Sequence, residues 1–405
     1  MLQWVAGKSR PTLRYDQGMS LPSAVVERIV ALRRDLHQHP ELSHCEHRTM
    51  DRIVHHLREL GLSPRAGVAG TGVVCDLPGK HEGPIVALRA DTDALPVHEE
   101  TGLSFASIHE GVMHACGHDG HTSMLVGAAA LLRADPPPLP VRLVFQPAEE
   151  KGAGAKEMIE EGVLEGVAMI FGGHLDRHYP PGQLIVTDGP VNASTDMFSI
   201  DIRGQQGHGA RPHEALDAIV VGSLLVTALQ TVVSREVDPA HPSVVTVGRF
   251  DAGSVGNVIA GRARLEGTIR AQHPSTREHL VSSLQRIAQA IAALHGARIE
   301  VAVQPGTPPV VNLPGPTALA REAAQLVVGP DRVGVLHTGN MGGEDFAYFL
   351  EHVEGCYIRY GAQVPGRESF PAHSSQFDIH EDALPLGAQW LDRVARVAGS
   401  HLRGS

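Results

Sequence analysis

The chain has 405 residues, of which 42% are hydrophobic and 20% are charged, and its formal net charge is -11. This composition excludes a disordered chain and indicates a globular protein of two or three domains. A net negative charge, with no dense cluster of Lys and Arg, argues against a surface that binds nucleic acid.

Cysteine usage and the chain ends indicate where the protein resides. Four cysteines in so long a chain are too few for a disulfide framework, which favours a reducing compartment. The N-terminal residues lack the apolar core of a signal peptide, and no stretch reaches the roughly 18 apolar residues of a membrane span. We therefore expect a soluble cytoplasmic protein with no membrane partner. Met19 could be the native start, and the tail 399–405 resembles a cloning remnant outside the fold.

The first part of the chain alternates between strand and helix patterns. Helices are expected at 22–38, 47–60, 121–134 and 153–162, and strands at 72–77, 84–90, 141–146 and 168–174. Such alternation predicts a mixed, mostly parallel sheet that is covered by helices on both faces.

The pattern changes near residue 192. The expected order is then strand 196–203, helix 214–234, strands 243–250 and 258–271, helix 275–295 and strand 298–303. This is the βαββαβ order of a ferredoxin-like domain. Alternation returns later with helix 316–328, strand 356–361 and helix 382–398. We therefore predict an α/β domain built from residues 19–190 and 305–398, with residues 191–304 inserted as a ferredoxin-like second domain.

The segment MHACGHDGH (113–121) is the densest group of chemically reactive side chains. In extended backbone, Cys116 and His118 would leave the chain on the same side. A thiolate and an imidazole are good ligands for Zn²⁺ and similar ions, and the following helix start should favour the thiolate. For Cys-x-His alone, a buried structural cysteine beside a capping histidine is the more common explanation.

Three other groups of ligand-type residues stand where predicted strands end. Glu149 and Glu150 close FQPAEE (145–150), so one carboxylate could bind metal while its neighbour moves a proton. His174 ends FGGH (171–174), and His373 lies in a loop near the C-terminus. A solvated acidic loop or an unremarkable histidine would explain each one singly. Strand ends at one edge of a parallel sheet converge, which favours a shared site.

Asp91 and Asp93 follow the strand that ends in RADTDAL (89–95). They could bind metal directly or hold a ligand imidazole through its second nitrogen. We favour the second role for both.

Taken together, the ordered motifs RADTDALP, MHACGHDGHTSML, FQPAEEKGAGAKEMIEEG, GQQGHGARPH and GGEDFAYF resemble those of the aminoacylase/carboxypeptidase family of two-metal hydrolases. The most similar branch contains hippurate hydrolases, N-acyl-amino-acid amidohydrolases and auxin-conjugate hydrolases. The resemblance runs from about residue 26 to about residue 387. It implies a di-zinc peptidase-like catalytic domain and an inserted lid that mediates dimerisation.

The resemblance also implies a role for each matching residue. Two divalent ions (Zn, Mn, Co or Ni) would be held by Cys116, His118, Glu150, His174 and His373, with Cys116 bridging them. Glu149 would be the general base. His208 would reach into the active site of the partner subunit in a homodimer. Asn257 and Arg270 would contact the substrate carboxylate, with His213 lining the same region. Lys151 and Ala260 depart from common residues of the branch.

The expected activity is hydrolysis of the amide bond of N-acyl amino acids by a metal-activated water. The same scaffold leaves open a dipeptidase, a carboxypeptidase or an N-carbamoyl-amino-acid hydrolase acting on short peptides or related small molecules. A non-catalytic metal- or peptide-binding protein is a further alternative, which the presence of Glu149 disfavours. A redox or structural use of Cys116 is disfavoured because the sequence places no second cysteine nearby.

Overall fold

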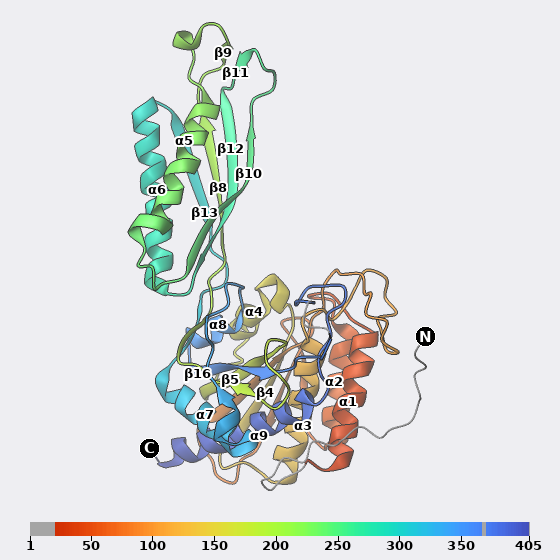
Figure 1. Ribbon diagram of the computed structural model, residues 1–405. Coiled ribbons are helices and arrows are strands. Elements are labelled where there is room, and N and C mark those ends of the chain that lie inside the picture. The colour runs from red at the N-terminus through yellow and green to blue at the C-terminus, as the bar shows by residue number, and fades with distance from the viewer. Residues whose placement is uncertain (1–20, 367–369, 405) are drawn as a thin grey trace.

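The computed structural model describes residues 21–366 and 370–404, which fold into a broad α/β body and an elongated second body that rises from it (Figure 1). The candidate start at Met19 and the final Ser405 lie outside the described residues. The predicted fold class, an α/β catalytic domain carrying an inserted ferredoxin-like domain, is confirmed.

An eight-stranded mixed sheet forms the centre of the α/β body. Its strands, in spatial order, are β1 (Arg65–Val68), β2 (Gly72–Leu77), β4 (Val141–Gln146), β3 (Ile85–Asp91), β5 (Val167–Asp176), β16 (Glu354–Gly361), β6 (Leu184–Ile185) and β15 (Val333–Gly334). The four central strands, β4, β3, β5 and β16, run parallel. Their carboxyl ends therefore share one edge of the sheet, which is where α/β proteins place ligands.

Helices cover both faces of this sheet. One face packs against α1 (Ser23–Gln38), α2 (His47–Glu59), α3 (His118–Ala134), α7 (Pro314–Val328) and α9 (Ala383–Gly404). The other face packs against α4 (Gly154–Glu160) and α8 (Phe346–Leu350). A short antiparallel pair, β7 (Gly189–Asn192) and β14 (Val310–Asn312), lies where the chain leaves and re-enters the body.

The second body, here called the lid, has a four-stranded antiparallel sheet and its own hydrophobic core. The strand order is β10 (Ser243–Ala252), β12 (Arg262–Ala271), β8 (Asp196–Arg203) and β13 (Arg298–Gln304). Helices α5 (Ala218–Thr231) and α6 (Pro274–His295) cover one face (Figure 1). This is the predicted βαββαβ order, while the domain limits at residues 191 and 304 stay predictions.

The two ends of the lid have different surroundings. The small sheet of β9 (Gly207–His208) and β11 (Val258–Ile259) lies at the tip, away from the α/β body (Figure 1). Strand β12 runs from this tip back to the base, because Arg262 pairs with Arg203 at one end and Ala271 lies at the other. Residues that are close in sequence at 257–271 are therefore spread along the whole lid.

One helical stretch of the described chain, Ala218–Glu236, is long and apolar enough to cross a membrane, with a mean hydropathy of 1.6. The sequence prediction found no span because it counted only uninterrupted apolar residues. Core helices of soluble proteins pass the same test, and the buried side chains of Val221, Leu225 and Leu229 pack this stretch into the lid core.

Some element limits differ from the sequence predictions for identifiable reasons. The predicted helix 214–234 begins at Ala218, because the Asp217 side chain caps it by accepting hydrogen bonds from the Ile219 and Val220 amides. The predicted strand 258–271 is split into β11 and β12. The tail 399–405, excluded from the fold, in fact continues α9 as far as Gly404. The short strand β1 was not predicted.

Candidate metal centre and active site

The predicted ligand residues meet at the carboxyl edge of the large sheet, beside a cavity of ≈ 730 Å³. Cys116, Glu149, Glu150, His174 and His373 all line this cavity. They come from the start of α3, the turn after β4, the end of β5 and the loop before α9. Convergence of strand ends, expected from the parallel order, is the reason that such distant segments meet.

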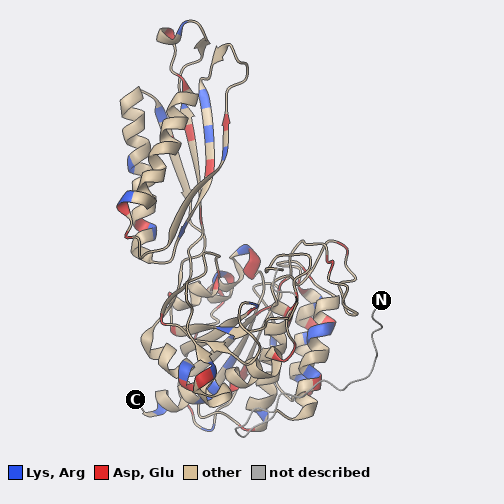
Figure 2. Cartoon of the chain, in the orientation of Figure 1, with Lys and Arg blue, Asp and Glu red and all other residues tan. Residues whose placement is uncertain are grey.

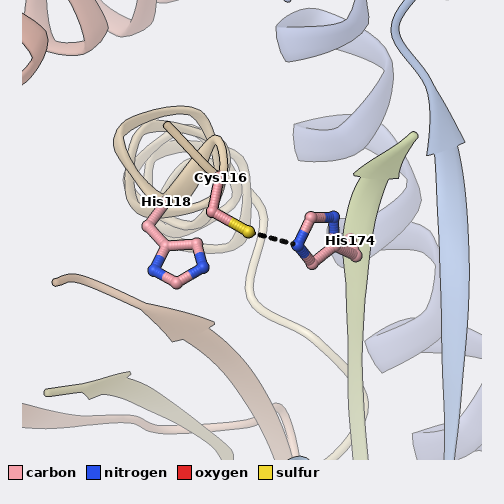
Figure 3. Close-up of side chains that lie close together, drawn as sticks. All are labelled: Cys116, His118 and His174. Atoms are coloured by element: carbon pink, nitrogen blue, oxygen red, sulfur yellow. Dashed lines mark hydrogen bonds between the residues drawn. The ribbon is translucent and has the colours of Figure 1, made fainter. Parts of the chain in front are cut away.

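Cys116 and His118 flank a sharp turn, which corrects the prediction of extended backbone. Gly117 has φ 93°, a left-handed conformation that glycine adopts without strain, and the helix α3 starts at the next residue. The Cys116 thiol then faces His174 on β5, with Sγ 3.2 Å from Nε2 (Figure 3). The ligand-type atoms of Cys116, His118 and His174 lie within 4.8 Å of one another.

A second group shares Cys116. The ligand-type atoms of Cys116, Glu150 and His373 also lie within 4.8 Å of one another, and His373 Nε2 is 3.4 Å from Glu150 Oε1. The amide of His373 donates to the Ala115 carbonyl at 2.8 Å, which ties the C-terminal loop to the turn before α3. The five predicted ligands thus form two groups with the Cys116 thiol in common.

The hydrogen bonds around these side chains leave lone pairs free for a cation. His118 Nδ1 donates to Asp93 at 3.1 Å and His174 Nδ1 donates to the Leu175 carbonyl at 2.7 Å. In the neutral imidazoles, each Nε2 therefore carries the lone pair that a cation would take. Among the described residues, buried His118 Nε2 and Glu150 Oε1 have no hydrogen-bond partner. Thiolate, imidazole and carboxylate donors in this arrangement fit two divalent cations.

The local electrostatics of Cys116 differ from the sequence prediction. Burial, together with the Glu150 carboxylate, raises the pKa of the Cys116 thiol to about 12, so the helix start does not by itself favour the thiolate. A coordinating cation deprotonates a thiol outright. Burial also dominates at His174, where it lowers the pKa of the imidazole well below its usual value.

Asp93 and Asp91 each hold a histidine. Asp93 accepts from His118 and also, through its other oxygen, from the Ser43 hydroxyl and the Glu150 amide. Asp91 lies 2.6 Å from Nδ1 of His121. His121 Nε2 accepts the Leu175 amide at 2.9 Å, so both of its nitrogens are engaged and it supports the site rather than coordinating. His121 was missed as a site residue, although it belongs to the segment 113–121.

Glu149 occupies the same cavity, and its carboxylate lies within 4.8 Å of the ligand-type atoms of both His118 and Glu150. Its Oε2 lies 3.9 Å from His118 Nε2, and its side chain is 12% exposed. Burial, and then the neighbouring carboxylates of Glu344, Glu150 and Asp345, raise the pKa of Glu149 well above its usual value. A carboxyl group with a raised pKa can exchange protons close to neutral pH, as a general base requires.

A buried ionic network lies next to Glu149. Arg89 Nη2 is 3.1 Å from Glu344 and donates to Asp345 at 2.9 Å, and the Tyr357 hydroxyl donates to Glu344. The motif GGEDFAYF contributed only to the resemblance, and no role was predicted for its two carboxylates. The adjacent acidic residues were the one sign of a role in the sequence, and their partner Arg89 could not be identified without the fold.

The sequence pattern of peptidase family M20/M25/M40 matches residues 87–397. The chain belongs to this family. It is 38% identical over 388 residues to the N-acetyl-L-cysteine deacetylase of Bacillus subtilis, covering 95% of this chain and 91% of that relative. It is 42% identical over 287 residues to the N-acyl-L-amino acid amidohydrolase of Geobacillus stearothermophilus, covering 70% and 78% respectively.

Solved structures agree with this assignment. The crystal structure of a dinuclear metal binding peptidase of the M20 family from Bacillus subtilis matches with a TM-score of 0.84 at 35% identity, covering 93% of this chain and 99% of that one. The resemblance that the motifs predicted is therefore confirmed. This M20 chain is a metal-dependent hydrolase that acts on amides.

The lid residues of this M20 chain divide into two locations. Arg270, at the base of β12, lines the cavity with the metal-site residues. His208 and Asn257 lie together at the tip, where Val258 pairs with His208 and the Gly209 amide donates to the Asn257 carbonyl at 2.9 Å. His213 lies in the same tip segment and is 77% exposed.

Within one chain, the structure therefore separates Asn257 and His213 from Arg270, and their roles in binding the substrate carboxylate stay predictions. The reason for the separation is the length of β12, which separates the tip from the base of the lid. Neighbouring positions in the sequence gave no sign of this separation.

Proposed function

We propose that this enzyme hydrolyses the amide bond of N-acyl amino acids, with Glu149 as the general base. The observation that carries the proposal is the shared cavity. Cys116, His118, Glu150, His174 and His373 form two groups of ligand-type atoms that share Cys116. The Glu149 carboxylate lies beside them, within 4.8 Å of His118 and Glu150. A protein that only binds metal or peptide needs the ligands but has no use for this base.

Divalent cations in these two groups would supply a nucleophilic water at neutral pH and polarise the amide carbonyl. Glu149 accepts a proton from the attacking water and donates it to the leaving nitrogen, so one carboxyl group serves both halves of the reaction. Asp93 keeps His118 in one tautomer and orientation during this cycle. Arg270 at the cavity rim neutralises the carboxylate of the amino-acid product.

We further propose that the enzyme is a homodimer in which His208 acts in the site of the partner subunit. Within one chain the His208 side chain is exposed and its Nδ1 only accepts the Ala210 amide. Helix α5 carries no charged residue and exposes Ile219, Val220 and Leu224 (Figure 2). An uncharged apolar helix face on a soluble body is typical of a subunit interface.

Other amide substrates are the alternatives to N-acyl amino acids. The chain is 38% identical over 367 residues to thermostable carboxypeptidase 1 of Saccharolobus solfataricus, so peptide substrates are the main alternative. N-carbamoyl amino acids are another. Zn, Mn, Co and Ni are the candidate ions, and the cytoplasm is the expected location.

The test is an amine-release assay on protein loaded separately with Zn²⁺, Mn²⁺, Co²⁺ or Ni²⁺. Substrates are N-acetyl, N-benzoyl and indoleacetyl amino acids, dipeptides and N-carbamoyl amino acids. We expect the N-acyl amino acids to be the best substrates. Preferential cleavage of dipeptides or carbamoyl compounds would reject the proposed substrate class.

The variant Glu149→Gln tests the general base, and Glu160→Gln is its control. We expect Glu149→Gln to lower kcat by at least about 100-fold with unchanged metal content, because general base catalysis contributes this much or more. Glu160 is an exposed carboxylate on α4, and its substitution should leave kcat unchanged. Near-normal turnover by Glu149→Gln would remove it from the mechanism.

A further inference from the structure

Arg359 is a buried cation in the wall of the active-site cavity, and no role was predicted for it. It is 5% exposed and lines the cavity. It lies on β16 directly beside His174 on β5, since the two residues are register partners in these parallel strands. Paired residues of neighbouring strands project from the same face of a sheet. The guanidinium therefore stands next to a predicted metal ligand.

The contacts of Arg359 leave most of its donors unused. Its Nη2 donates to Asn192 Oδ1, and its Cζ lies 5.4 Å from the centre of the Tyr357 ring. Among residues 21–366 and 370–404, no carboxylate forms an ion pair with it. A guanidinium has five N–H donors in a planar fork that fits one carboxylate.

The other buried arginines of the described chain show what Arg359 lacks. Arg33 pairs with Asp119 at 2.9 Å and Arg89 pairs with Asp345 at the same distance, so each buried charge has its counter-ion. Burying an unpaired charge is costly, and buried arginines are normally matched by anions. The cavity side of Arg359 is where an external anion would complete the same pairing.

We propose that Arg359 binds a second carboxylate of the substrate and so selects N-acyl amino acids that carry two carboxylates. This inference rests on the proposed function, in which Arg270 takes the carboxylate next to the scissile amide. Asn192 positions the guanidinium, because its amide group also donates to the Gly342 carbonyl at 3.2 Å. The second carboxylate could belong to a dicarboxylic acyl group or to the side chain of an acidic amino acid.

The experiment compares matched acidic and neutral substrates. One pair is N-succinyl-L-alanine and N-pentanoyl-L-alanine, and the other is N-acetyl-L-glutamate and N-acetyl-L-glutamine. We expect the acidic member of one pair to have the higher kcat/KM. Arg359→Met should lower kcat/KM for that acid by about 10- to 100-fold, the size of a lost charged hydrogen-bond pair, and change the neutral member little. The pair that responds identifies the source of the carboxylate.

Two further variants separate recognition from folding. Arg359→Lys keeps a charge but not the fork, so it should lower the acid-to-neutral ratio less than Arg359→Met does. Arg65→Met, an exposed arginine on β1, should leave the ratio unchanged. Metal content and Tm measured on each protein report whether the site next to His174 is intact.

The outcomes distinguish this inference from the proposed function. If neutral N-acyl amino acids are hydrolysed and both Arg359 variants slow acidic and neutral substrates equally, the proposed function stands and the role of Arg359 is rejected. If no N-acyl amino acid is hydrolysed, the proposed function fails, and calorimetric titration with glutarate decides about Arg359. Tighter binding of glutarate to wild type than to Arg359→Met supports the anion site, and equal binding overturns it.

Discussion

The α/β body and the lid present their functional side chains in opposite ways. In the body, four of the five predicted ligands and the base are buried or half-buried, while the His373 side chain is 54% exposed, and partners in the same chain hold them, as Asp93 holds His118. In the lid, His208 and Asn257 are exposed at the tip, far from the cavity of their own chain (Figure 1). Of the lid residues predicted to act on the substrate, Arg270 at the base of the lid lines the cavity of the body.

This difference leads to the proposal that the metal centre is complete in one chain, whereas the tip of the lid acts only in the dimer. Folding of one chain suffices to bring together the residues of the metal centre, because the strand ends converge within one sheet. In the proposed homodimer, the tip of the lid would gain its neighbours from the second subunit. The predictions below therefore test whether the body is completed by metal ions and the lid by a second subunit.

The largest expected effect comes from combining two inactive subunits. We expect His208 to stabilise the oxyanion that forms in the partner's site, so His208→Ala should lower kcat by roughly 100- to 1000-fold. Glu149→Gln on its own should lower kcat by at least about 100-fold. A purified heterodimer of the two variants has one site with both groups intact if His208 acts across the interface. Its rate should return to roughly half the wild-type value in a symmetric dimer.

The control for this complementation is a heterodimer in which one subunit carries both substitutions and the other none. It also contains one altered copy of each residue, but each of its sites lacks one of the two groups if they act across subunits. It should be nearly inactive. Activity in the doubly substituted heterodimer, with none in the first, would place His208 in its own chain and contradict the comparison.

Metal removal should affect the two regions unequally. His118 Nε2 and Glu150 Oε1 are buried without hydrogen-bond partners among the described residues, so bound cations would stabilise the body. At a free metal concentration of about 100 times Kd the gain is roughly 2.7 kcal/mol per site. Chelation should lower Tm and increase amide exchange in α3. Exchange in the lid core at Ile200 and Leu265 should not change, and equal loosening of both regions would contradict this expectation.

A charge on the apolar face of α5 should separate the subunits. Val220 and Leu224 are 48% and 42% exposed, and Glu at both positions would add charge to a face that carries none. We expect a monomer by light scattering, with metal content preserved and kcat reduced to the level of His208→Ala. Leu326→Glu is the matched control, because Leu326 is 56% exposed but lies on α7 of the body. If the protein remains a dimer with both charges on α5, the interface does not include this helix face.

Much of the fold and of the metal centre could be predicted from the sequence because both depend on local patterns. The limits predicted for β4 and β8 coincide with those observed, since each strand is a short apolar or alternating run between clear breaks. The predicted ligands meet because parallel strands end together. The left-handed conformation of Gly117 was not predicted, because it depends on packing beneath α3 rather than on the pattern of apolar residues.

Features that depend on distant contacts could not be predicted. The pairing of Arg89 with Glu344 and Asp345 joins residues more than half the chain apart, and no periodicity indicates it. The isolation of Arg359 is likewise visible only when all of its neighbours are known. The separation of Asn257 from Arg270 within one chain could not be predicted for the same reason, since sequence distance does not report the length of the strand that separates them.

The smallest expected effect concerns a buried histidine that fixes α1 to the start of α3. Burial and the nearby Arg33 oppose protonation of His37, but hydrogen bonds to Asp119 and Glu99 outweigh them, and its pKa is raised above 6.5. The charged form therefore stabilises the fold fully below pH 6.5, and this contribution is lost as pH rises through the raised pKa.

The variant His37→Gln should accordingly destabilise the body more in mild acid than in alkali. We expect the variant to lose about 1–3 kcal/mol of unfolding free energy at roughly pH 6. The loss should be smaller at about pH 9, because fewer of the His37 side chains are charged there. Urea unfolding at the two pH values measures the difference. His55→Gln, which alters an exposed histidine on α2, should show little change at either pH. An equal loss at both pH values would mean that His37 stabilises the body by packing, not by the charge it shares with Asp119 and Glu99.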